Sequence, residues 1–334
     1  MTSKRNGRAT LADVAAAAGV SKSTASRAFS RPELIRPENV ERIRRIAAEL
    51  GYTADPRARA LSTGRTANIA VIVPDIANPF FPPLVRAVES GAERAELAVF
   101  LGDTDESASR ERVLVDRLEK QVDGFVLASP RLPDAQIREL AERVPTVLIN
   151  RDIPGVHRVL VDAATGVREA VELLIALGHR AIAYLAGPPE SWADQQRRDA
   201  VVQAAAHAGL ALSVLELGRP SYEAGRECVG SMIATGATAA IAFDDVIAHG
   251  VLAGFATLGR EVPADFSVIG CDDVLAATTF PALTTISGGS AASGAAALDT
   301  LLALIDGEHP EQRTAIAGHL VHRASVSAVR QHAR

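Results

Sequence analysis

Residues 10–29 read TLADVAAAAGVSKSTASRAF, and this stretch decides the fold of the first part of the chain. Thr10 is a good N-cap for a helix over 11–18, whose alanines favour the helical state. Gly19 ends that helix and permits a tight turn, after which a serine can cap a second short helix over 22–29. The stretch therefore predicts two short helices joined by a turn.

A third helix is predicted over 37–50, where apolar residues recur at helical spacing. The residues expected to face the core of this head are Leu11, Val14, Ala15, Val40, Ile43, Ile46, Ala47 and Leu50. Two short helices with a glycine-containing turn and a third helix form a helix-turn-helix arrangement. Its second helix would enter the major groove of DNA. On that helix, Lys22, Ser23 and Arg27 carry hydrogen-bond donors that suit base edges. The alternative is a generic three-helix bundle.

The charge distribution separates this head from the rest of the chain. The 334 residues carry a net charge of −5, but residues 1–65 hold 13 Lys/Arg against 6 Asp/Glu. A basic head on an acidic body indicates that the head meets a polyanion and the body does not. A solvated basic tail is the alternative that charge alone leaves open.

Composition excludes several classes of protein. With 48% hydrophobic and 22% charged residues, the chain resembles an ordinary globular protein and not a disordered one. No apolar run is long enough for a transmembrane helix, and the first residues lack the apolar region of a secretory signal. Two cysteines, Cys228 and Cys271, are too few for a disulfide scaffold and too isolated for a zinc site. We therefore expect a cytoplasmic protein with no membrane partner.

Beyond residue 66 the sequence alternates apolar runs with helical stretches such as 107–120 and 163–177. The expected strands are 69–73, 98–101, 124–127, 146–149, 159–161, 181–185, 239–242 and 267–269. Strand–helix alternation predicts parallel sheets covered on both faces. About ten strands are too many for one compact sheet of this length, so we expect two similar α/β subdomains with a ligand cleft between them.

The whole pattern resembles the lactose repressor (LacI/GalR) family of bacterial transcription regulators. The head motif is followed by GYTADPRARALSTGRT and NIAVIVPDIANPFF, then by VDGFVLASP, LINRD, LGHRAIAYLAGP, AIAFDDVIAHGVL, VPADFSVIGCDD and PALTTI in the order of the family. The resemblance implies a helix-turn-helix head, a hinge helix and a two-subdomain body like periplasmic binding proteins. The implied limits are 8–55 for the head, 56–66 for the hinge and linker, and 67–334 for the body. Within the body, 67–161 with 290–318 would form one subdomain, and 162–289 with 319–330 the other.

The resemblance also assigns roles in DNA binding. Lys22, Ser23 and Arg27 occupy base-reading positions, and Leu61 lies at the position of a wedge in the minor groove. Thr24 and Ser26 are implied to contact DNA phosphates, and the other residues implied to contact DNA are Tyr52 and Arg59. A segment as short as 56–62 is a marginal helix alone, so we expect it to form only when DNA and a second subunit support it.

Polar loops after the expected strands supply the candidate effector site. In the family, residues that match Asn150, Arg197, Asp244 and Asp272 line the effector pocket, and the family commonly has Asn at position 244. Carboxylates and a guanidinium suit sugar hydroxyls, and aromatic faces suit the apolar side of a sugar. The same loops add Phe80, Asp103 and Trp192 as candidates, whereas we expect turn or capping roles for Asp75, Asp245 and Asp273.

No enzymatic motif accompanies these residues. The sequence has no G-x-G-x-x-G after the first strand, no P-loop, no G-x-S-x-G and no histidine spacing for a metal. The stretch GGSAASG at 288–294 is interpreted as a crossover between subdomains. We expect a regulator without enzymatic activity, cofactor or metal. We expect it to be a repressor that binds a palindromic operator as a homodimer and is controlled by a sugar or sugar derivative. A transport-type sugar-binding protein, an α/β enzyme with a regulatory head, and a tetramer are the alternatives.

Overall fold

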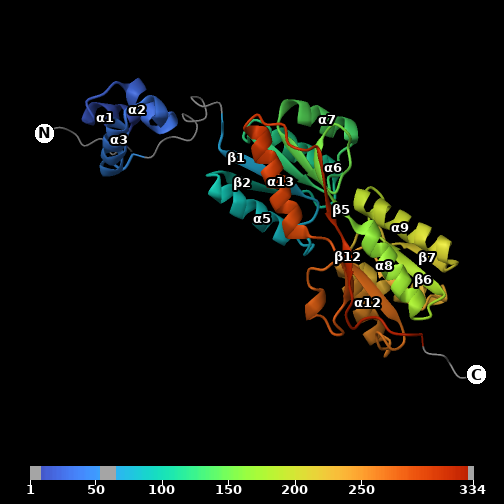
Figure 1. Ribbon diagram of the computed structural model, residues 1–334. Coiled ribbons are helices and arrows are strands. Elements are labelled where there is room, and N and C mark those ends of the chain that lie inside the picture. The colour runs from blue at the N-terminus through green and yellow to red at the C-terminus, as the bar shows by residue number, and fades with distance from the viewer. Residues whose placement is uncertain (1–8, 53–64, 330–334) are drawn as a thin grey trace, which may run out of the picture. The chain divides into compact units, whose positions relative to one another are not determined.

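The computed structural model describes residues 9–52 and 65–329. The predicted hinge helix at 56–62, with Arg59 and Leu61, lies outside the described residues. The described chain divides into a helical head and an α/β body, which we treat separately (Figure 1). None of the described helices is both long and apolar enough to cross a membrane.

The head has the predicted helix-turn-helix arrangement. Its helices are α1 (Leu11–Ala17), α2 (Lys22–Ser30) and α3 (Pro37–Glu49), with a 3-10 turn η1 (Pro32–Leu34) before α3. Thr10 caps α1 in a capping box with Asp13, and Ser21 caps α2 by accepting from the Thr24 N–H at 3.0 Å. The local signals read from the sequence therefore place both helix starts correctly.

The core of the head is small. It contains the buried side chains of Val14, Ala18, Ala28, Ile43 and Ala47. The prediction that Leu50 faces inward is wrong, because Leu50 is the C-cap of α3 and is 43% exposed. Tyr52 packs on this core instead, with its ring 5.6 Å from that of Phe29.

The first lobe of the body is a six-stranded sheet in the order β11-β5-β4-β3-β1-β2. Its strands are β1 (Asn68–Val73), β2 (Ala98–Asp103), β3 (Gly124–Ala128), β4 (Thr146–Ile149), β5 (His157–Asp162) and β11 (Arg313–Ala317). Its helices are α5 (Phe81–Arg94), α6 (Ala108–Leu118), α7 (Asp134–Arg143) and α13 (Ser290–Ile305). α5 and α13 cover one face of the sheet, and α6 and α7 lie on the other (Figure 1).

The second lobe repeats this plan with the order β12-β10-β9-β8-β6-β7. Its strands are β6 (Ala181–Ala186), β7 (Ala211–Glu216), β8 (Ala239–Ala242), β9 (Ser267–Asp272), β10 (Thr284–Ser287) and β12 (His319–Val321). Its helices are α8 (Ala163–Ala176), α9 (Trp192–Ala208), α10 (Tyr222–Glu227), α11 (Val229–Ala234) and α12 (Asp245–Thr257), and the 3-10 turn η2 (Ala276–Thr278) follows β9. α8 and α9 pack on one face of the sheet and α11 and α12 on the other.

Each lobe contains segments from distant parts of the chain. The chain leaves the first lobe after β5, returns from β10 into α13, and leaves again after β11 to add β12 antiparallel to β10. The stretch 288–294 is thus a crossover, as the sequence indicates. All the strands predicted for the body are present, but β7, β10, β11 and β12 were not predicted as strands.

Candidate functional site

A cavity lies between the two lobes, at the carboxyl ends of their strands. Both lobes contribute to its wall: Asn78, Phe80, Phe81, Glu106, Ser129, Arg131 and Asn150 come from the first lobe, and Ser191, Ala193, Arg197, Pro220, Phe243 and Asp272 come from the second. Its volume is about 30 Å³, far below the ~300–1,000 Å³ of typical small-molecule pockets. The space between the lobes therefore has to widen before it can hold a sugar-sized ligand.

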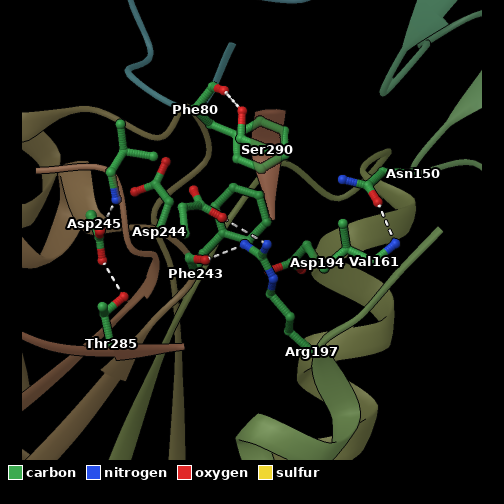
Figure 2. Close-up of polar contacts among 12 residues, drawn as sticks. Phe80, Asn150, Val161, Asp194, Arg197, Phe243, Asp244, Asp245, Thr285 and Ser290 are labelled. Carbon is green, nitrogen blue, oxygen red and sulfur yellow. Dashed lines mark hydrogen bonds and ion pairs between the residues drawn. The ribbon is translucent and has the colours of Figure 1, made fainter. Parts of the chain in front are cut away.

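A buried ion pair forms the wall of the second lobe. Arg197 Nη2 donates to Asp272 Oδ1 at 2.9 Å, and the two residues are 5% and 8% exposed. Arg197 Nη1 donates to the carbonyl of Phe243, and the guanidinium stacks 4.9 Å from the centre of the Phe243 ring (Figure 2). Arg197 Nε is buried and has no hydrogen-bond partner among the described residues, which leaves one strong donor unused.

The local backbone holds this pair in place. Arg197 lies on α9, whose N-cap is Ser191, and Asp272 ends β9 with a φ of 117°. Burial raises the pKa of Asp272 well above its ordinary value, and the charge of Arg197 opposes that rise. Loss of water on burial destabilises the ionised carboxylate of Asp272 unless a cation pairs with it. Asp272 therefore needs the guanidinium of Arg197 beside it.

Asn150 organises the facing edge of the first lobe. It follows β4 with a φ of 53°, a left-handed conformation that asparagine tolerates. Its side-chain oxygen accepts from the Val161 N–H at 3.0 Å and so ties the end of β4 to β5 (Figure 2). Its remaining amide N–H groups are the donors it can offer to a ligand.

Asp244 joins the lobes. It accepts from Asn78 Nδ2 at 3.0 Å and caps α12 by accepting from the Ile247 N–H at 2.8 Å. Burial raises the pKa of Asp244 to about 6, and these donors, with the charge of Arg197, limit the rise.

The neighbouring Asp245 has a structural role. It accepts from Thr285 Oγ1 at 2.6 Å and from the Val274 N–H at 3.2 Å, and it does not line the cavity. Burial raises the pKa of Asp245 to about 7.

Three candidates from the sequence do not line the cavity: Asp244, whose contacts are given above, Trp192 and Asp103. Trp192 is half-buried at the start of α9, while its neighbours Ser191 and Ala193 reach the wall. Asp103 ends β2 and accepts from the Asp105 N–H at 2.9 Å, which is a turn interaction. Phe80, by contrast, is buried in the wall, where its ring meets that of Phe81 edge-on at 5.2 Å.

Sequence reasoning missed the polar residues of the first-lobe wall. Arg131 and Glu106 form an ion pair of 2.7 Å there, and Ser129 and Asn78 lie beside the cavity. A signal was available: Arg131 follows β3 by three residues, just as the selected candidates follow their own strands.

In the head, α2 exposes Lys22 and Ser23 in its first turn and Arg27 in its last turn. Thr24 and Ser26 are half-buried, and Thr24 Oγ1 also lies 2.8 Å from Ser21 Oγ. Two cations and a hydroxyl exposed along a second helix suit base edges and phosphates. The described residues contain no cluster of His, Cys, Asp or Glu that could hold a metal ion.

A helix-turn-helix head and a two-lobed body with a polar cavity are the architecture of a DNA-binding regulator. Residues 10–55 match the family model "Bacterial regulatory proteins, lacI family", and residues 171–326 match "Periplasmic binding protein-like domain". The HTH-type transcriptional repressor CytR of Escherichia coli (strain K12) is 33% identical over 318 residues, which cover 92% of each chain. The chain therefore belongs to the LacI/GalR family, a family of DNA-binding transcriptional regulators that are not enzymes.

Solved structures agree with this assignment. The lac repressor dimer bound to operator and the anti-inducer ONPF superposes with a TM-score of 0.85 at 26% identity, covering 96% of this chain and 100% of that one. A LacI family regulator from Enterococcus faecium with bound ribose gives a TM-score of 0.69 at 26% identity, covering 79% of this chain and 100% of its own.

Proposed function

We propose that this chain is a repressor that binds a palindromic operator as a homodimer, and that a sugar or sugar derivative between the lobes changes its operator affinity. The observation that carries the proposal is the buried Arg197–Asp272 pair in the wall of the interlobe cavity. Its carboxylate accepts from hydroxyls, and its guanidinium retains an unused donor.

The DNA-binding half rests on α2. Lys22, Ser23 and Arg27 are exposed on one short helix, so one head offers only a few base contacts. Specific sites usually require affinities of ~10⁻⁸–10⁻¹¹ M, which so few contacts do not supply. Two heads on a palindrome double the contacts, in keeping with the dimeric lac repressor on its operator.

The proposal that an effector controls the protein is supported by the small cavity between the lobes. A ligand that fits only when the lobes separate has different affinities for the open and closed forms. Such a difference is what allows a ligand to shift an equilibrium between two conformations. The ribose-bound relative supports a sugar as the kind of ligand, and CytR supports repression as the outcome. A protein with this role acts in the cytoplasm, where operator DNA is.

The test is selection of binding sites from random DNA, followed by footprinting. We expect a near-palindromic sequence in which one dimer protects two half-sites. A protein that stays monomeric and protects one half-site would contradict the proposal. The selected operator then serves in titrations with D-ribose, D-glucose and D-galactose, of which at least one should change the operator affinity.

A further inference from the structure

The first-lobe wall of the cavity carries its own partly buried ion pair. Arg131 Nε donates to Glu106 Oε2 at 2.7 Å, and the two side chains are 6% and 17% exposed. Arg131 follows β3 and Glu106 follows β2, the strands on either side of β1, so two strand-end loops of one lobe bring them together. Both residues line the cavity, which the Arg197–Asp272 pair lines from the other lobe.

The loop that carries Arg131 is held firmly. Arg131 Nη1 donates to the carbonyl of Ser129 at 2.8 Å. The backbone N–H groups of Arg131 and Leu132 donate to Glu111 Oε2 at 2.7 and 3.1 Å, and Glu111 is buried on α6. The other N–H groups of the Arg131 guanidinium have no acceptor among the described residues, so they are available to a ligand.

We infer that Arg131 and Glu106 form a second polar subsite, which binds a hydroxyl group of the effector from the lobe opposite Arg197 and Asp272. The inference rests on the proposed function, because it describes the same ligand. A fixed guanidinium beside a carboxylate offers a donor and an acceptor together, which matches adjacent hydroxyls on a sugar ring. Glu111 is a positioning residue that fixes the loop.

The charges of the wall also define the ligand class. Arg131, Glu106, Arg197 and Asp272 are the charged residues among those that line the cavity, and each cation is already paired with a carboxylate. A phosphate or carboxylate on the ligand would meet Glu106 and Asp272 and would have to displace one of them. The subsite therefore selects an uncharged polyol over its phosphorylated or oxidised form.

The experiment is isothermal titration of the full chain with matched probes: D-ribose and ribose 5-phosphate, D-glucose and glucose 6-phosphate, and D-galactose and galacturonate. The variants are Arg131→Met, Glu106→Gln and Asp272→Asn. Arg110→Met is the matched control, because Arg110 pairs with Asp105 in the same lobe but is 57% exposed. We expect an uncharged probe to bind and its charged partner to bind at least tenfold more weakly. Arg131→Met should weaken the uncharged probe about 10- to 100-fold, as expected for a lost charge-assisted hydrogen bond.

Monodeoxy forms of the sugar that binds separate recognition from loop support. If Arg131 contacts one hydroxyl, the form that lacks this hydroxyl should bind wild type and Arg131→Met almost equally, whereas a loosened loop would weaken every form alike. Any of three results would overturn the subsite. Arg131→Met could weaken all deoxy forms equally, a charged probe could bind more tightly than its uncharged partner, or Arg131→Met could keep the full affinity of wild type for the sugar. If Asp272→Asn abolishes sugar binding and Arg131→Met leaves it intact, the subsite is wrong but the proposed sugar effector stands. If no probe binds wild type, the proposed sugar effector fails, and the subsite fails with it.

Discussion

Asn78 of the first lobe donates from Nδ2 to Oδ2 of Asp244 in the second lobe at 3.0 Å, while Oδ1 of the same carboxylate caps α12. One buried carboxylate thus links the two lobes and also caps the start of a helix. Its pKa, which burial raises to about 6, means that the carboxylate is ionised at pH 8 and largely protonated at pH 5.

Asn78→Ala should destabilise the body more at pH 8 than at pH 5. At pH 8 the ionised Asp244 loses a donor, which costs ~1–3 kcal/mol, and at pH 5 the protonated carboxyl depends less on that donor. Urea unfolding followed by the fluorescence of Trp192, the single tryptophan, measures the loss at both pH values. Equal losses at the two pH values would show that Asn78 does not stabilise the charged form.

Glu111→Gln should make the stability of the body less dependent on pH. Burial raises the pKa of Glu111 from an ordinary 4.5 to about 7. Between these values the folded protein keeps a proton that the unfolded chain has released, so wild-type stability falls as pH rises through this window. Relative to wild type, the variant should gain stability between pH 5 and 8, by at most about 3 kcal/mol. Parallel stability curves for the two proteins would contradict this assignment.

Gly294→Ala should destabilise the body by ~1–3 kcal/mol, because the new methyl group would collide with the backbone carbonyl of Leu84 on α5. Gly230→Ala is the matched control: Gly230 lies on α11 with open space around it, and alanine favours a helix. Thermal unfolding of both variants compares them. Unchanged stability of Gly294→Ala would mean that α5 and α13 do not require this close approach.

The sequence predicted the helices of the head well, because their caps are local. Thr10 and Ser21 act within one turn of their own helices, so neighbouring residues suffice to find them. Leu50 was misplaced because helical periodicity does not tell where the last turn leaves the core. Strands β7, β11 and β12 lie at sheet edges and are only partly buried, so they lack a continuous apolar run.

Partners within the candidate site were harder to predict. Arg197 and Asp272 were each expected to contact a ligand, but their pairing across 75 positions depends on how α9 and β9 meet. The hydrogen bond between Asp244 and Asn78 could not be predicted from the sequence, because the two residues lie on different lobes. Arg131 and Glu106 follow the same strand-end rule as the predicted residues, and applying it to every strand would have found them.

Lys22→Ala and Arg27→Ala should relax the preference for particular base pairs of the selected operator. A good bidentate contact contributes ~1–3 kcal/mol of discrimination at its own base pair. Thr24→Val, at a predicted phosphate contact, should instead weaken all sequences alike. Competition binding with operators changed at single positions measures both effects. A uniform loss for Lys22→Ala and Arg27→Ala would remove these residues from base reading.

Leu61→Ala should reduce affinity for the selected operator and leave nonspecific DNA binding nearly unchanged. The predicted wedge partly unstacks a minor-groove step and kinks the duplex, and alanine is too short to do so. A DNA-bending assay with a circularly permuted operator measures the kink. Unchanged bending and affinity would remove Leu61 from the interface.

In the proposed function, a ligand between the lobes controls operator binding through the Arg197–Asp272 pair. Its most direct test is fluorescence anisotropy of labelled operator, with and without a saturating concentration of the sugar that binds, for wild type and Asp272→Asn. Coupling between two sites typically changes affinity by ~5- to 150-fold and is reciprocal. We predict such a change for wild type, and for Asp272→Asn a normal operator affinity that the sugar no longer alters. A wild-type operator affinity that stays constant with the sugar bound would show that the ligand does not control operator binding. An Asp272→Asn protein that responds like wild type would show that the Arg197–Asp272 pair does not carry the effect.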